Sequence, residues 1–105
     1  MNCYFCKNNL ALEGNRQKYL TFYCVECECQ HIYNSNLQLE VMVLYYNKFR
    51  ILFELFNQTA SLELQSKYTK NYDMKWEPVS SINFSFIDLS IKDLHNKINL
   101  YTPFL

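Results

Sequence analysis

Apolar and polar residues alternate along the middle of the chain, which indicates β-strands. In the segment 37–46 every second residue is apolar and lies on one face: Leu37, Leu39, Val41, Val43 and Tyr45. The other face begins with polar residues and then becomes apolar at Met42, Leu44 and Tyr46. A strand that is apolar on both faces is typical of the centre of a sheet that is covered on both sides.

Shorter alternating runs follow, and they predict three more strands, at 50–56, 60–65 and 82–87. The polar residues between the first of these runs, at 47–48 and 57–59, are typical of tight turns. The order of the runs therefore predicts an antiparallel meander with short loops. The segment 67–78 is polar and irregular. It contains the only tryptophan, Trp76, which we expect to fold back against the edge of the core.

The period changes from two to that of a helix near the C-terminus. Apolar residues recur at helical spacing at Ile91, Leu94, Ile98 and Tyr101. Ser90 and Asp93 have the spacing of a capping box, and we expect the helix to end before Pro103. Packing a helix on a sheet buries both apolar surfaces. We therefore expect it to lie over Met42, Leu44, Leu52 and Phe56; the alternative is that this surface stays open for a partner or a second copy.

The first third of the chain carries two CxxC pairs, Cys3/Cys6 and Cys24/Cys27. Four thiolates in a tetrahedron about 2.3 Å from the metal are a common structural zinc site, with no open position for a catalytic water. The residues between the pairs suit a hairpin, with strands at 9–13 and 18–23. The only glycine, Gly14, is expected at a turn that needs a positive φ. The spacing predicts one structural Zn²⁺ held by these four cysteines.

Residues 1–33, with a CxxC pair at each end of the expected hairpin, resemble the zinc-ribbon class of zinc fingers. This resemblance implies a structural metal, and it is compatible with transcription factors, ribosomal proteins, polymerase subunits and interaction modules. Zinc ribbons often have glycine after the second cysteine of each pair, where this chain has Lys7 and Glu28. We expect an α+β fold in which a zinc-ribbon-like hairpin continues into the antiparallel meander, with one C-terminal helix packed on the sheet. The domain prediction is a single domain, 1–105, with a zinc-knuckle module at 1–33 and the meander and helix at 34–105.

Cys29 and His31 follow the second pair closely, and each is an alternative fourth ligand. The CxxC geometry favours Cys24 and Cys27. We therefore expect Cys29 to be a small strand residue and His31 to support the site from a strand. Cysteines also form disulfides, redox motifs and iron–sulfur clusters, all of which we rank below zinc in a reducing compartment.

The composition argues against several classes of function. The formal net charge is zero, so a general attraction to nucleic acid is not expected. A single glycine excludes a glycine-rich phosphate loop, and no catalytic motif is present, so we expect a protein that is not an enzyme. The N-terminus lacks the pattern of a signal peptide, and no run reaches eighteen apolar residues, so we expect a cytoplasmic protein.

Charged residues make up 19% of the chain and aromatic residues 17%, which favours a protein-binding module. In size, composition and its ending at 88–105, the chain resembles small uncharacterised accessory proteins of bacteriophages with AT-rich genomes. That resemblance implies a protein of the host cytoplasm that binds or inhibits host machinery, such as a polymerase or a defence nuclease. The alternatives are a structural subunit of a larger assembly and a nucleic-acid-binding zinc ribbon that uses Lys7, Arg16 and Lys18. The partner's identity and the oligomeric state stay open.

Overall fold

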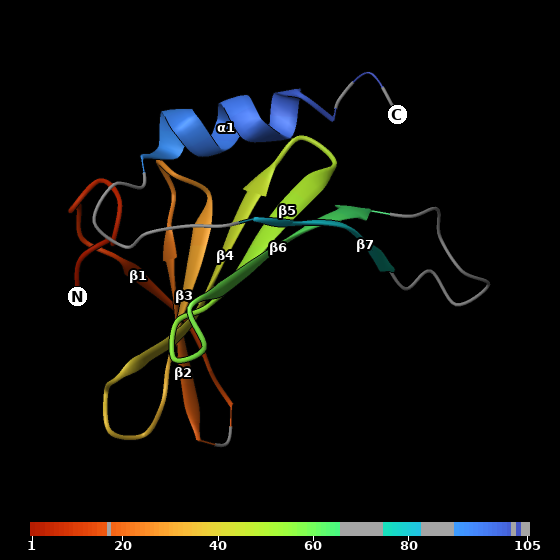
Figure 1. The fold of residues 1–105 in the computed structure, drawn as a ribbon. Helices are drawn as coiled ribbons and strands as arrows, with labels where there is room; N and C mark the ends of the chain where they lie inside the picture. Colours follow the sequence, from red (N-terminus) through yellow and green to blue (C-terminus); the bar gives the residue numbers. More distant parts are fainter. Residues whose placement is uncertain (17, 66–74, 83–89, 102, 104–105) are drawn as a thin grey trace.

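The computed structural model describes residues 1–16, 18–65, 75–82, 90–101 and 103. Its strands form one antiparallel sheet in which spatial order follows chain order (Figure 1). The seven strands are β1 (Ala11–Arg16), β2 (Tyr19–Cys24), β3 (Cys29–Tyr33), β4 (Leu39–Tyr46), β5 (Phe49–Glu54), β6 (Thr59–Gln65) and β7 (Trp76–Ile82). One helix, α1 (Ile91–Asn99), follows them. The predicted meander is present, and short turns join β2 to β3, β3 to β4, β4 to β5 and β5 to β6.

The expected α+β class with a zinc-ribbon-like hairpin is wrong, because the described chain is mostly one sheet and the hairpin is part of it. β2 pairs with β1 on one side and with β3 on the other, from Leu20↔Tyr33 to Cys24↔Cys29. β3 in turn pairs with β4. The chain re-enters the sheet at Cys29, two residues after Cys27, so β2 acquires a second neighbour at once. The first two strands are therefore one edge of a seven-stranded sheet.

Gly14 is not at the turn where it was expected. It lies within β1, opposite Thr21, beside a register shift between Leu12 and Gly14, and its φ is not positive. β1 continues to Arg16, which pairs with Tyr19, so the chain reverses after Arg16. Glycine in a strand often accompanies such a bulge. The left-handed positions are elsewhere, and none of them is a glycine: Lys7, Glu28, Leu37, Asn47 and Gln58.

The strands β4, β5 and β6 lie within a few residues of their predicted positions. β4 begins at Leu39 because Leu37 has φ of 60° in a turn closed by the bond from its N–H to the Asn34 carbonyl (3.0 Å). β7 was missed, because Pro78 sits inside it and the segment 67–78 looked irregular. A register shift between Leu62 and Glu63 accompanies the proline. Of the predicted strand 82–87, all but Ile82 lies outside the described residues.

The core lies on one face of the sheet. Paired strands present buried side chains to that face: His31, Met42, Leu44, Phe49, Ile51, Phe53, Ala60 and Leu62. The helix packs against it with Leu94 and Ile98, both fully buried, as its apolar stripe predicted. The predicted cap is also present, since the Ser90 hydroxyl accepts from the Asp93 N–H at 3.1 Å.

The helix does not cover all of the surface predicted for it. Met42 and Leu44 are in the core, but Leu52 pairs with Val43 on the opposite face, and Phe56 is exposed. Figure 1 shows α1 at one end of the sheet, beside the turn from β4 to β5. There His95 stacks on Tyr46 at a centroid distance of 3.9 Å, and burial lowers the pKa of His95.

Candidate metal centre

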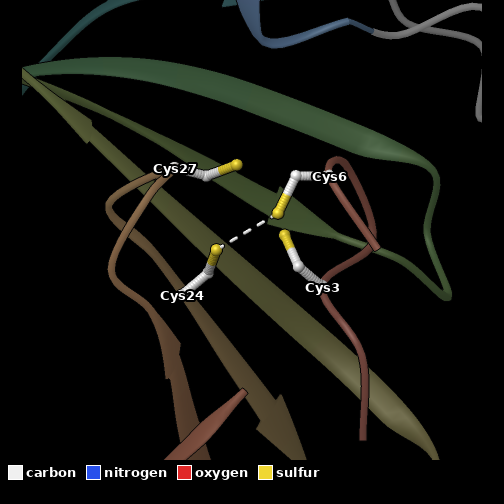
Figure 2. Close-up of side chains that lie close together, drawn as sticks. All are labelled: Cys3, Cys6, Cys24 and Cys27. Carbon is white, nitrogen blue, oxygen red and sulfur yellow. Dashed lines mark hydrogen bonds between the residues drawn. The ribbon is translucent and has the colours of Figure 1, made fainter. Parts of the chain in front are cut away.

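Four cysteine side chains converge at the N-terminal end of the core. The sulfur atoms of Cys3, Cys6, Cys24 and Cys27 all lie within 4.8 Å of one another, and all four are free thiols. Figure 2 shows Cys3 and Cys6 on the N-terminal turn, facing Cys24 and Cys27 on the turn between β2 and β3. Sulfurs bound to one tetrahedral zinc are about 3.8 Å apart, from a Zn–S distance of about 2.3 Å. The donor set and its spacing therefore fit a single metal ion.

The first CxxC turn is closed by its own backbone. The Cys3 N–H donates to the Asn8 carbonyl (2.8 Å), and the Lys7 N–H donates to the Cys3 carbonyl (3.1 Å). Lys7 has φ of 67°, and its ammonium donates to the Tyr4 carbonyl at 2.7 Å. The Asn8 N–H bonds the Cys6 sulfur and lowers the pKa of that thiol, which favours the thiolate that a metal requires.

The second CxxC turn repeats this geometry between two paired strands. Cys24 ends β2, and the Cys27 N–H bonds its sulfur. Glu28, one residue past the second cysteine, has φ of 55°. Its carbonyl accepts from the Tyr45 N–H at 3.0 Å, which ties the turn to β4. Lys7 and Glu28 therefore adopt the left-handed conformation without glycine, at a cost of about 1 kcal/mol each.

Burial makes this cluster unfavourable for bare thiolates. It raises the pKa of Cys24 to about 11, and burial and neighbouring thiols also raise the pKa of Cys27. Several negative sulfurs packed together would repel one another at low dielectric. A dication bound among them offsets both effects, and its binding releases protons. The electrostatics of the site therefore suit a metal better than free anions.

His31 is fully buried and makes two hydrogen bonds. Its Nε2 lies 3.1 Å from the N–H of Tyr4, and its Nδ1 lies 3.3 Å from the carbonyl of Cys29. A backbone N–H can only donate, so Nε2 is the unprotonated acceptor and Nδ1 carries the proton. Burial lowers the pKa of His31, which is consistent with a neutral ring. His31 thus links β3 to the middle of the first CxxC turn, 27 residues away.

Neither alternative ligand joins the cluster. Among the described residues, the group of close ligand atoms contains the four CxxC cysteines without Cys29 or His31. Cys29 is buried in β3, and its sulfur lies 3.6 Å from the Gln30 carbonyl. Both residues instead face the core side of the sheet, opposite Leu44 and Met42. The sequence marked His31 as supporting the site, but its bond to Tyr4 is visible only in the folded chain.

The cysteine cluster is continuous with the hydrophobic core. Cys3, Cys24 and Cys27 belong to the same packed cluster as Leu44 and Phe53. Phe5, from the first CxxC turn, packs at 6.1 Å from Phe53. Opening of the cysteine cluster would therefore expose core surface as well as free the two turns.

Comparison with known proteins gives this chain no relative. No family model matches it, and no curated protein or solved structure matches it significantly. Within the described residues, no helix has the length and apolarity needed to cross a bilayer. The interpretation of the site consequently rests on its own geometry and chemistry.

Proposed function

We propose that the four cysteines hold one structural Zn²⁺ and that the protein is a small zinc-stabilised protein-binding module without catalytic activity. The observation that carries the metal proposal is the convergence of four thiols from two turns at the edge of the core. Soft thiolate ligands in a tetrahedral set select zinc or an iron–sulfur cluster. A single ion needs only the space between the four sulfurs, and this favours zinc.

The metal's role in this proposal is to hold the two turns against the sheet. A catalytic zinc usually keeps a position for water beside three protein ligands. Here a fourth sulfur takes the position of that water, and three of the four sulfurs belong to buried residues. The ion's role in this proposal is therefore structural: it ties the N-terminal turn to the turn between β2 and β3.

The proposed partner surface is the face of the sheet opposite the core. Val41 and Leu52 lie on this face, since their neighbours Met42 and Phe53 point into the core. Four of its apolar side chains are half-buried: Ile32, Val41, Tyr45 and Leu52. Arg50 and Glu63 flank these side chains at one end of the face, and Glu54 lies beside Val41 at the other. An apolar centre with a polar rim is typical of a protein interface. This face supports binding to a protein more than to a phosphate backbone.

Phe56 extends this surface at one end. It is 66% exposed, and together with Val41 it lines a depression of about 150 Å³ beside Glu40, Glu54 and Asn57. An exposed aromatic ring beside a shallow depression is the kind of group that anchors protein complexes. A host protein, such as a polymerase or a defence nuclease, is the partner class that we propose from the resemblance to bacteriophage accessory proteins.

Replacing Phe56 by lysine should weaken capture of the partner at least about tenfold, because a charge replaces an apolar anchor. The measurement is quantitative affinity capture from host lysate with a C-terminal tag, followed by mass spectrometry. Leu100→Lys is the matched control, since Leu100 is 72% exposed but lies just past α1, on the core side. Equal capture by both variants and the parent protein would remove this face from the proposal.

A further inference from the structure

The four sulfurs of the metal centre differ in their access to solvent. The exposed fractions of Cys3, Cys24 and Cys27 are 1%, 0% and 6%, whereas Cys6 is half-buried. Cys6 lies on the short N-terminal turn, outside the paired strands that enclose Cys24 (Figure 2). A small solute can therefore reach Cys6 while the fold stays closed, and it can reach the others only after the turns open.

Cys6 also has a thiol partner at contact distance. Its sulfur lies 3.5 Å from the sulfur of Cys24, on the other CxxC turn (Figure 2). A disulfide needs the two sulfurs about 2.05 Å apart, so they must approach by about 1.5 Å. The first turn precedes β1 and its strand pairing is an isolated bridge, Asn2↔Asn9, whereas the second turn joins two fully paired strands, so the first turn can supply that movement more easily.

We propose that Cys6 is an oxidation site for small peroxides and that its oxidation ejects the metal. This inference rests on the proposed zinc site and adds a regulation to it. The Cys6 sulfur attacks one oxygen of hydrogen peroxide, the O–O bond breaks, and a sulfenic acid and hydroxide result. The Cys24 sulfur then attacks the Cys6 sulfur, an S–S bond forms, and a second hydroxide leaves.

These two steps balance in electrons. Two thiolates lose two electrons and become one disulfide, while one peroxide gains two electrons and becomes two hydroxides, which take up protons as water. Of the four cysteines, only Cys3 and Cys27 would then remain to hold a metal, and two thiolates would not retain it. The disulfide then joins the same two turns that the metal joined, so the oxidised chain keeps a covalent link between them.

The first test measures zinc release from the zinc-loaded protein with a chromogenic chelator at several peroxide concentrations. We expect a release rate proportional to peroxide concentration and a Cys6–Cys24 disulfide in the peptide map. A rate that does not change with peroxide would overturn the inference, because oxidation would then follow unfolding. Protein that contains no zinc when purified would instead contradict the proposed zinc site, so the two failures are distinguishable.

A pair of cysteine variants separates Cys6 from the buried thiols. Cys6→His supplies a nitrogen ligand but removes the accessible sulfur, and it should slow peroxide-driven release by at least about tenfold. Cys29→Ala removes a fully buried thiol outside the group of close sulfurs and should leave the rate within about twofold. Equal slowing in both variants would contradict a special role for Cys6.

A second measurement needs no variant and holds even if one of them fails to bind zinc. The zinc-loaded protein is treated briefly with iodoacetamide and then mapped by mass spectrometry. We expect Cys6 to be alkylated at least about ten times faster than Cys3, Cys24 and Cys27. Uniform labelling of the four residues would overturn the inference, because it would show that access requires opening of the whole site.

Discussion

Replacing Cys24 by serine should abolish tight zinc binding and unfold the N-terminal part of the sheet. Cys24 is fully buried at the end of β2, where it pairs with Cys29. Structural zinc supplies about 10–16 kcal/mol of apparent binding free energy in zinc-finger peptides, whereas whole domains are stable by about 5–15 kcal/mol. Losing tight zinc binding therefore removes an amount of stability comparable with the whole reserve of the fold. Elemental analysis measures the zinc content, and circular dichroism the loss of structure.

Cys29→Ala is the matched control for this experiment. Cys29 is as buried as Cys24 and lies directly opposite it, but it is outside the group of close sulfurs. Its replacement should cost about 1–2 kcal/mol from lost packing and leave one zinc per chain. Loss of zinc from the Cys29 variant would show that the ligand assignment is wrong.

Replacing His31 by leucine should lower the free energy of unfolding by about 2–4 kcal/mol. The change leaves the Tyr4 N–H and the Cys29 carbonyl without the ring nitrogens that they contact. Two lost hydrogen bonds together cost about 1–3 kcal/mol, and repacking of the fully buried site adds to this loss. Urea denaturation of the zinc-loaded protein measures the loss.

A second readout separates support of the metal site from general packing. Because His31 holds the middle of the first CxxC turn, zinc should pass from His31→Leu to a chelator about ten times faster than from the parent protein. His31→Gln should release zinc more slowly than His31→Leu, since the glutamine amide oxygen can accept from the Tyr4 N–H. A packing control, Ile51→Val, alters the same core with a cost of about 1 kcal/mol and should not change the zinc release rate. Identical release from all four proteins would contradict the proposed role of His31.

The sequence predicted the parts of the site that depend on local geometry. A CxxC turn brings its own two sulfurs together, and the β-forming residues of β2 carry the chain to Cys24. Alternation located β5 and β6, since one face of these strands meets the core. The long apolar run at 37–46 located β4. The helical spacing of Leu94 and Ile98 located α1 for the same reason.

The errors involve information that is not local. Cys29 and His31 were expected in a strand, but the pairing of that strand with both β2 and β4 depends on how the chain leaves Cys27, which the sequence does not show. Gly14 was assigned to a turn, since glycine favours positive φ, but here it accompanies a bulge. β7 was not predicted because it contains Pro78, and proline is expected in strands only at edges or irregularities. In the structure a register shift accommodates this proline.

His31 illustrates the limit for the site itself. The alternation of Cys29 and His31 in β3 is a signal that both face the core. A buried histidine needs hydrogen-bond partners, and one of them is Tyr4, which is distant in sequence. Only the folded arrangement identifies that partner.

The most direct test of the central claim is the metal content of protein purified without chelator, measured together with its fold. We expect one zinc per chain by native mass spectrometry, and removal of that zinc at acidic pH should unfold the N-terminal strands. The opposite result is a chain that is equally folded without metal, or one that contains iron and sulfide in place of zinc. Either outcome would contradict a structural zinc held by Cys3, Cys6, Cys24 and Cys27.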